Sequence, residues 1–231
     1  MKNLLISSVV AAGLLGGIAN AKSGAFVGVN VGVPITTPEY KGGLRTGSEQ
    51  FPNSGVGYAL GVDLGYKQMF GEGMFGLRYY VDYYFSQSFG SKTTQIAPTS
   101  LDVTIDATIS QHLVNANIDV LFNPLSWLGV YVGIGVGYQG FAPVYSVTSP
   151  NPQNPQPATT TTDEGVKGGF SLPLNVGLNF NLGESHALNV GAKIPLVGYD
   201  YSIASFMNTP IPDSSVGLRS YIIKVGYSYT F

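Results

Sequence analysis

Apolar side chains alternate with small or charged ones over long stretches of this chain. The apolar positions between residues 55 and 68 are Val56, Tyr58, Leu60, Val62, Leu64 and Tyr66. Successive side chains of a strand point to opposite faces, whereas a helix would scatter these residues around its circumference. The alternation therefore predicts a β-strand with one apolar face.

The same pattern recurs along the chain and predicts eight strands in total. They cover 24–33, 55–68, 75–86, 111–122, 128–139, 169–182, 187–196 and 216–231. Three connections are short (69–73, 123–127 and 183–186), and four are long (34–54, 87–110, 141–168 and 197–215). An even strand number with alternating short and long connections is typical of an outer-membrane barrel. We therefore predict an all-β fold: an eight-stranded antiparallel transmembrane β-barrel with short periplasmic turns and four long extracellular loops.

The composition indicates that the apolar strand faces point outwards, into lipid. Only 10% of the residues are charged, whereas about a quarter are charged in a typical soluble domain. A β-sandwich would keep a charged, wet polar face, and a lipocalin-like barrel would place its apolar residues inside. The expected location is the outer membrane of a Gram-negative bacterium, in contact with membrane lipid and lipopolysaccharide.

Charge and cysteine content also exclude several classes of function. The net charge of −2 lacks the basic face that nucleic acids require, so no nucleic-acid partner is expected. The absence of Cys excludes disulfide scaffolds, thiol enzymes and iron–sulfur proteins.

Residues 1–21 have the organisation of a secretory signal peptide. A positive start at Lys2 precedes an uncharged stretch, and Ala19 and Ala21 stand at the two positions that signal peptidase reads. We expect cleavage after Ala21, which leaves 22–231 as the barrel domain. The final strand has aromatic residues at alternate positions and ends in Phe231, the kind of signal that barrel-assembly machinery recognises.

Two parts of the sequence resemble the Helicobacter outer membrane protein family. One is the Phe75-Gly-Leu-Arg-Tyr-Tyr80 segment, and the other comprises His186, Gly191-Ala-Lys-Ile-Pro195, Tyr221 and Val225-Gly-Tyr-Ser-Tyr-Thr-Phe231. The resemblance covers the third predicted strand and the last strand pair. The family includes adhesins with large extracellular domains and smaller barrels that are regarded as porins or left without an assigned role. Because this chain has no room for a separate adhesin domain, the resemblance implies a small barrel, and the adhesin role is not carried over.

Charged residues on the predicted inward face are the main candidates for a functional site. They are Asp63, Lys67, Arg78, Asp82, Asp119, Lys193 and Lys224. We expect Asp63 to lie opposite or diagonal to Arg78, across a hairpin centred near Phe70 and Gly71. Eight strands enclose only enough space for side chains, and isolated buried ions are costly. The favoured interpretation is a salt-bridge network that fills the lumen; the alternative is a narrow diffusion channel in which Arg78 and Lys193 select anions.

Aromatic side chains gather near the predicted short turns. They are Tyr66, Phe70, Phe75, Phe122, Trp127, Tyr227 and Tyr229. Amphipathic rings favour the headgroup level of a membrane, so we expect these residues to form an aromatic girdle.

Motifs for catalysis or cofactor binding are weak, and no enzyme, cofactor or metal is predicted. Residues 135–140 match G-x-G-x-x-G literally, but a dinucleotide site needs a helix directly after the strand. A third functional hypothesis is a lipid-modifying enzyme at the extracellular rim, with His112 near Ser110 and Asp106. It requires His112 within hydrogen-bond reach of the Ser110 hydroxyl.

The long connections leave two further expectations. Their Ser, Thr, Pro, Asn and Gln content is compatible with a host or neighbouring surface ligand, and the 150–162 stretch is expected to be an extended loop. A ten-stranded barrel would need 93–110 to form an extra membrane hairpin, but we expect this segment to lengthen the rim strands. Pro173 and Pro195 fall within predicted strands, where a bulge would accommodate the missing N–H.

Overall fold

The computed structural model describes residues 21–231 except 97–100, 152–153 and 207–208. The strands are β1 (Gly24–Lys41), β2 (Gly55–Phe70), β3 (Phe75–Ile96), β4 (Leu101–Leu125), β5 (Leu128–Asn151), β6 (Asn154–Asp163), β7 (Lys167–Ser171), β8 (Pro173–Asn181), β9 (His186–Pro195), β10 (Tyr199–Phe206) and β11 (Thr209–Thr230). Two short 3-10 segments, η1 (Gly42–Gln50) and η2 (Gly71–Gly73), complete the secondary structure. None of the helices in this part of the chain is long and apolar enough to cross a membrane.

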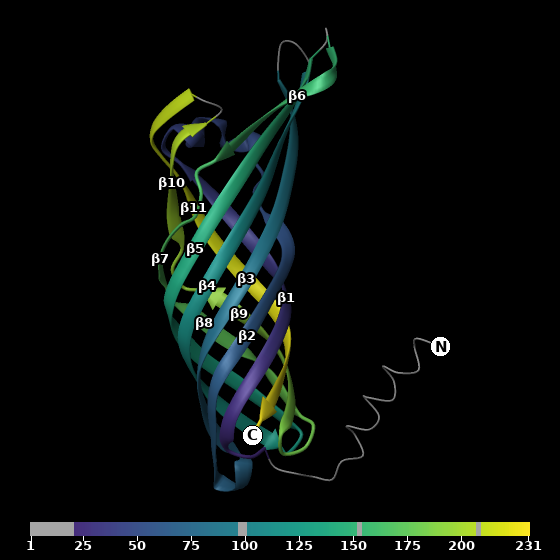
Figure 1. Ribbon diagram of the computed structural model, residues 1–231, viewed down its shortest axis with the longest axis vertical. Coiled ribbons are helices and arrows are strands. Elements are labelled where there is room, and N and C mark those ends of the chain that lie inside the picture. The colour runs from purple at the N-terminus through teal and green to yellow at the C-terminus, as the bar shows by residue number, and fades with distance from the viewer. Residues whose placement is uncertain (1–20, 97–100, 152–153, 207–208) are drawn as a thin grey trace, which may run out of the picture.

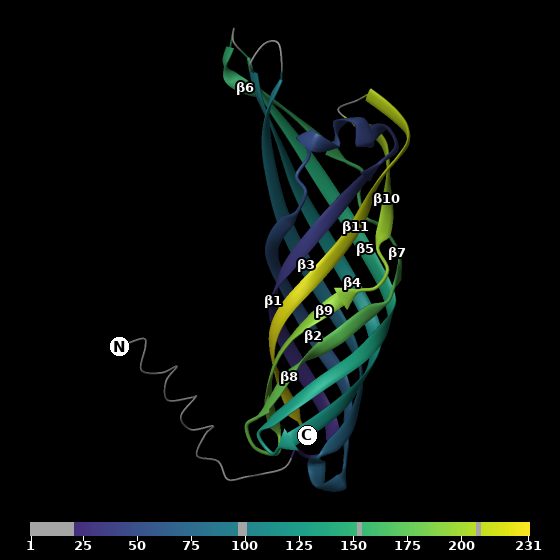
Figure 2. The same ribbon diagram turned by 180° about the vertical axis from the view of Figure 1, so that it is seen from behind.

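The strands form one antiparallel sheet that closes on itself. Neighbours follow the order β1-β2-β3-β4-β5-β8-β9-β11, and β11 pairs in turn with β1. Figures 1 and 2 show the resulting long cylinder, with its strands inclined to the long axis. The predicted all-β, antiparallel architecture is confirmed.

The number of strands differs from the prediction, because the described residues contain 11 strands rather than eight. β6 and β7 both pair with β5, and β10 pairs with β11, so these three lie beside the closed path. The predicted strand 169–182 is divided at Leu172 into β7 and β8, directly before Pro173. Proline has no N–H to donate to a ladder, and here Pro173 stands opposite Pro195, the last residue of β9.

Much of the chain predicted as long loops continues as strand. β3 and β4 remain paired up to Ile96 and Leu101, and β5 extends to Asn151. Residues 154–163 form β6 against β5, so the expectation of an extended loop over 150–162 is wrong. Within the described residues, 93–110 forms the ends of β3 and β4, as expected, and no separate hairpin.

The two faces of the strands exchange polarity partway along the cylinder while the register stays unbroken. On β4 the outward side chains are apolar from Val114 to Phe122 and polar from Asp102 to His112. The inward side chains change in the opposite sense, with buried Asn115, Asn117 and Asp119 below and buried Ile105, Ala107 and Ile109 above. We call this level the polarity switch. It explains the loop error, because above it the alternation no longer places apolar residues outside.

An apolar core fills the cylinder above the polarity switch. Its buried members are Tyr40, Leu44, Phe51, Ile105, Ala107, Ile109, Phe141, Tyr145, Val147, Tyr201, Ile203, Val216 and Leu218. They come from β1, β4, β5, β10, β11, η1 and the connection after η1, so segments distant in the sequence meet there. We call this cluster the upper core.

The C-terminus and the η2 turn lie at the lower end of the cylinder, opposite β6 (Figure 1). The Phe231 N–H donates to the Ala25 carbonyl at 2.9 Å, which joins the last residue to the start of β1. Ala21 is buried, whereas Ala19 and the rest of the predicted signal peptide lie outside the described residues.

Candidate functional site

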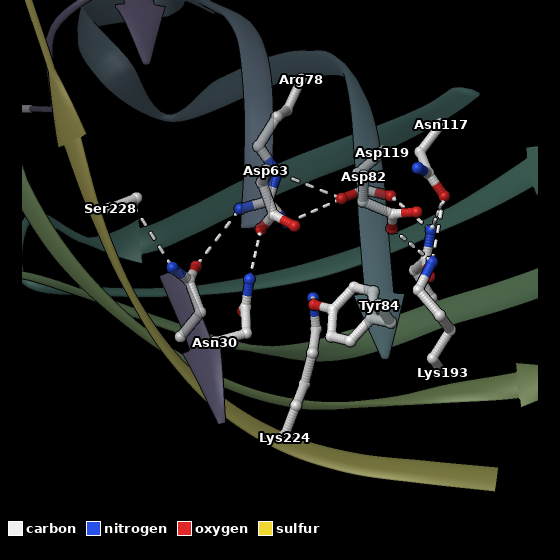
Figure 3. A network of polar contacts seen from close by, with 12 residues as sticks. Asn30, Asp63, Arg78, Asp82, Tyr84, Asn117, Asp119, Lys193, Lys224 and Ser228 are labelled. Atoms are coloured by element: carbon white, nitrogen blue, oxygen red, sulfur yellow. Dashed lines mark hydrogen bonds and ion pairs between the residues drawn. The ribbon is translucent and has the colours of Figure 1, made fainter. Parts of the chain in front are cut away.

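Alternation along the strands places the predicted charged residues inside the cylinder, below the polarity switch. Figure 3 shows all of them except Lys67. Asp63 is half-buried, and the other members of the set are buried: Lys67, Arg78, Asp82, Asp119, Lys193 and Lys224. The network is built from five strands, β2, β3, β4, β9 and β11.

One ion pair joins β3 to β4. Arg78 donates from Nε and Nη2 to Asp119 Oδ2 at 3.1 and 2.7 Å, and its Nη1 donates to Asn189 Oδ1 at 3.2 Å. The guanidinium carbon also lies 4.7 Å from the centroid of the Tyr131 ring. Asp119 has no exposed surface, so this pair is held in a dry interior where a lost partner is costly.

A second ion pair connects β9 with β3. Lys193 Nζ lies 2.7 Å from Asp82 Oδ2 and donates to Asn117 Oδ1 at 3.2 Å. Beside it, Lys224 Nζ donates to the Tyr84 hydroxyl at 2.8 Å, so the ring of Tyr84 lies between the two ammonium groups. The two pairs and this bridge span the interior in several directions.

The expected position of Asp63 opposite or diagonal to Arg78 is wrong. Asp63 stands opposite Asp82, whereas Arg78 stands opposite Lys67. Like charges directly opposite each other destabilise a sheet, and other strands provide the compensation. Asn30 Nδ2 donates to Asp63 Oδ2 at 2.9 Å, while Asp82 has Lys193 as its partner.

Sequence reasoning based on charge missed the amides and tyrosines of the network. Asn175 Nδ2 donates to Asn117 Oδ1 at 2.9 Å and approaches Asp119 Oδ1 at 3.3 Å. The Tyr131 ring lies over Gly177 and Gly191, where an added Cβ would meet its hydroxyl group. The alternation pattern could have identified these residues, since it places them on the same inward face as the charged ones.

The predicted aromatic residues lie on the outer wall near the lower end. Six of them are exposed: Tyr66, Phe70, Phe75, Phe122, Trp127 and Tyr227. Tyr229 is half-buried and contacts His186 and Phe231 edge-on. A second group of exposed rings near the polarity switch was not predicted: Tyr58, Tyr83, Phe89, Tyr138 and Phe170.

The residues of the enzymatic hypothesis do not contact one another. His112 Nδ1 is 2.9 Å from the Tyr83 hydroxyl, and Ser110 Oγ accepts from Gln87 Nε2 at 3.2 Å. Asp106 is exposed and stands opposite Ser91. The G-x-G-x-x-G match at 135–140 lies within β5, which continues as strand to Asn151 instead of turning into a helix. No group of three or more metal-ligating side chains occurs among the described residues.

Above the polarity switch, side chains close a seam between β7 and β10. Glu164 Oε1 accepts the backbone N–H groups of Ala204 and Ser205 at 2.7 and 3.3 Å, and its Oε2 lies 2.6 Å from Lys167 Nζ. Lys167 also donates to the Ser202 carbonyl at 2.7 Å. Burial raises the pKa of Tyr201 to about 12, so its hydroxyl stays protonated and donates to the Gly165 carbonyl.

We expect this seam to loosen in acid. Burial acts to raise the pKa of Glu164, but Lys167 and the two N–H groups outweigh it and leave that pKa lowered. The carboxylate's stabilising contribution is therefore complete above its ordinary pKa of about 4.3 and is lost as pH falls through the lowered value. The amide proton shifts of Ala204 and Ser205 should titrate with one midpoint below that ordinary value.

The matched variant is Glu164→Gln, in which both amide shifts should stay flat over the same pH range. Glu72→Gln, in the η2 turn at the other end, serves as the control and should titrate as the wild type does. Asp163, next to Glu164 in the chain, and Asp213, which lines a pocket with Lys167 and Ala204, are further acidic groups near the seam. Asp163→Asn and Asp213→Asn separate their titrations from that of Glu164. Flat wild-type curves, or a midpoint above the ordinary value, would contradict the role of Glu164.

Comparisons with known proteins place the chain. A family model described as Helicobacter outer membrane protein matches residues 61–231. Neisserial surface protein A has 13% identity and a TM-score of 0.43 over 91% of this chain and 99% of that one. OprG from Pseudomonas aeruginosa has 13% identity and a TM-score of 0.47 over 92% and 98%. Ail from Yersinia pestis has 13% identity and a TM-score of 0.38 over 90% and 99%.

The search of curated proteins finds no match. The family match covers more than half of the chain and includes the segments that carried the resemblance in the sequence. The predicted location, the outer membrane of a Gram-negative bacterium, is confirmed. This chain is an outer-membrane β-barrel protein and belongs to the Helicobacter outer membrane protein family.

Proposed function

We propose that the protein is an eight-stranded transmembrane barrel with a filled, non-conducting lumen. Its role is structural in the envelope or interactive at the cell surface, through the part of the barrel above the polarity switch. The observation that carries the proposal is that two different kinds of packing close the interior, one above the other.

The first closure is the ionic network. Asp82, Asp119, Lys193 and Tyr84 each have at most 2% of their surface exposed. Charged groups that line an aqueous path keep contact with water, because hydration compensates their charge. Here protein partners supply that compensation, which supports a lumen without a continuous water column.

The second closure is the upper core. Phe141, Val216 and Leu218 have no exposed surface, and the Phe141 ring is stacked on Tyr199 at 6.2 Å between centroids. A solute that entered from outside would have to displace an apolar core before it reached the network. This arrangement supports a closed barrel over the porin-like alternative.

The proposed partners follow from this placement. The outer wall contacts outer-membrane lipid and lipopolysaccharide, and the exposed Phe231 at the end of the closing strand serves as the signal for barrel-assembly machinery. The projecting ends of β3, β4 and β5 with β6 (Figure 1) offer a surface to a host or neighbouring ligand. We propose no catalytic role, since Ser110 and His112 have other partners.

Conductance tests the proposal. The mature chain is refolded in detergent, shown to be folded by its heat-modifiable gel shift, and added to planar bilayers. We expect no stable steps over many insertions, while a general porin inserted under the same conditions gives them. Stable steps whose ion selectivity changes in Arg78→Gln or Lys193→Gln would reject the closed lumen and favour a diffusion channel.

A further inference from the structure

A cleft of about 460 Å³ opens on the outer wall where β1, β10 and β11 lie side by side (Figure 2). Its position relative to the apolar belt follows from the register. Ile35 and Tyr221 pair at the top of the belt, and the next outward pair, Thr37 and Arg219, lies at the edge of the cleft. The cleft is therefore at the polarity switch, the level at which lipid headgroups meet the barrel.

Two glycines form the floor of the cleft. A Cβ at Gly217 would lie 3.0 Å from Asp200 Oδ1, and one at Gly198 would lie 3.0 Å from Arg219 Cγ. Gly217 stands between Glu39 on β1 and Asp200 on β10 in the pairing register. The missing side chains leave space between charged groups of both signs.

The charges around this space are not all satisfied by one another. Lys41 Nζ is paired with Asp200 Oδ1 at 2.7 Å, and it is 4.0 Å from Glu39 Oε2. The Glu39 side chain is 77% exposed. Arg219 is exposed, and within the described part of the chain its guanidinium has no hydrogen bond or ion pair. Arg219 thus remains available, and Glu39, which is held only by the long 4.0 Å contact with Lys41, keeps most of its carboxylate surface for a ligand.

The available charges also have a defined spacing. Arg219 stands opposite Thr37, and Glu39 is the next outward residue on the same strand as Thr37. Two residues along a strand correspond to roughly 7 Å. A ligand that satisfies both groups needs a negative and a positive centre a few ångströms apart.

We propose that this cleft binds the phosphoethanolamine headgroup of an outer-membrane lipid. The phosphate accepts from the Arg219 guanidinium, whose fork of donors matches phosphate oxygens. The ammonium donates to the Glu39 carboxylate. The inference deepens the proposed function, because it rests on the transmembrane placement of the belt below the cleft.

Other headgroups satisfy less of the cleft. A purely anionic phosphate group would meet Arg219 but bring negative charge toward Glu39, while Asp200 and Lys41 already compensate each other. A divalent cation would meet the two carboxylates and leave Arg219 without a partner. A trimethylammonium group carries the positive charge but has no N–H to donate, so the hydrogen bond to Glu39 is absent.

Lipid titration of the full mature chain in maltoside micelles tests this site. The probes are dihexanoyl phosphatidylethanolamine, the phosphatidylcholine and phosphatidylglycerol with the same acyl chains, and O-phosphoethanolamine without them. The readout is the backbone amide shifts of Gly198 and Gly217. We expect saturable binding of phosphatidylethanolamine, at least about fivefold tighter than either other lipid, from charge-assisted hydrogen bonds made only by its headgroup.

Substitutions then assign the two contacts. Arg219→Gln should weaken phosphatidylethanolamine binding about tenfold, as expected for the loss of a charge-assisted phosphate contact. Glu39→Gln should remove the preference over phosphatidylcholine. Arg45→Gln changes an exposed arginine on η1 outside the cleft and should leave the affinity unchanged.

Equal affinity for the three lipids, or an unchanged affinity in Arg219→Gln, would overturn the proposal. Saturation by O-phosphoethanolamine at the same concentrations would overturn a lipid as the source of the headgroup. Because the gel shift and conductance are measured separately, loss of binding in a folded, silent barrel rejects only the headgroup site. Conducting steps with binding retained reject only the closed lumen.

Discussion

Replacing Asp119 by Asn is expected to lower the free energy of unfolding by about 3–5 kcal/mol, the cost of leaving one member of a buried ion pair without its partner. Asp119 has no exposed surface and accepts two hydrogen bonds from Arg78. The substitution keeps the shape of the side chain but leaves the guanidinium charge uncompensated. Urea titration in detergent, followed by the fluorescence of Trp127, measures the change.

The matched control lies on the same strand. Asp106→Asn makes the same chemical change on the exposed outer face of β4, and its effect should stay within about 0.5 kcal/mol. The double variant Arg78→Met with Asp119→Leu removes both charges and should recover most of the loss. Equal changes in the free energy of unfolding for Asp119→Asn and Asp106→Asn would mean that the interior is hydrated. The proposal that the ionic network closes the lumen would then be rejected.

A second large effect is expected in the upper core. Phe141→Ala should cost about 3–5 kcal/mol, because it removes a fully buried ring and leaves a cavity. The ring has no exposed surface and is stacked on Tyr199. The same urea titration measures this loss of free energy of unfolding.

Phe141→Leu separates packing from other consequences of the substitution. Leucine refills most of the space, so its cost should stay below about 1.5 kcal/mol. A barrel whose upper interior is open to water would respond weakly to both changes. Similar, small losses for Phe141→Ala and Phe141→Leu would therefore contradict the upper core.

The polarity switch explains which parts of the fold could be predicted from the sequence. Below the switch, every outward position from Val114 to Phe122 on β4 is apolar, so the alternation showed both the strand and the outward face. Above it, residues such as Asp106 and Ile105 still alternate, but in the inverse sense. A search for apolar outward faces reads that stretch as loop, and the extensions of β3, β4 and β5 were missed for this reason.

The membership of the ionic network was easier to predict than its pairing. Charge, together with the alternation that places every second residue on the inward face, was sufficient to select Asp63 and Arg78. Which residues stand opposite each other on β2 and β3 depends on the position of the hairpin turn. The prediction centred the turn near Phe70 and Gly71, whereas Phe70 still pairs with Phe75. Gly71, Glu72 and Gly73 all have positive φ, so the turn lies about two residues later. That shift moves Asp63 from Arg78 to Asp82.

Contacts between strands that are not neighbours cannot be predicted from the position of a hairpin turn. Lys193 meets Asp82, and Lys224 meets Tyr84, across the interior rather than along a ladder. These contacts depend on the curvature with which the sheet closes between β1 and β11. A single strand carries no information about that curvature.

The exchange of polarity along the strands also determines the depth of insertion of the barrel in the bilayer. A shift towards the outside would lift rings such as Tyr66 and Phe75 out of their level and expose Val114 to water. A shift towards the periplasm would press the polar outer faces of His112 and Ser110 into hydrocarbon. Either movement costs free energy in proportion to the apolar area moved into water or the polar groups moved out of it. The barrel therefore has one vertical position, and that position holds the headgroup cleft and the Glu164 seam at constant heights relative to the lipid surface.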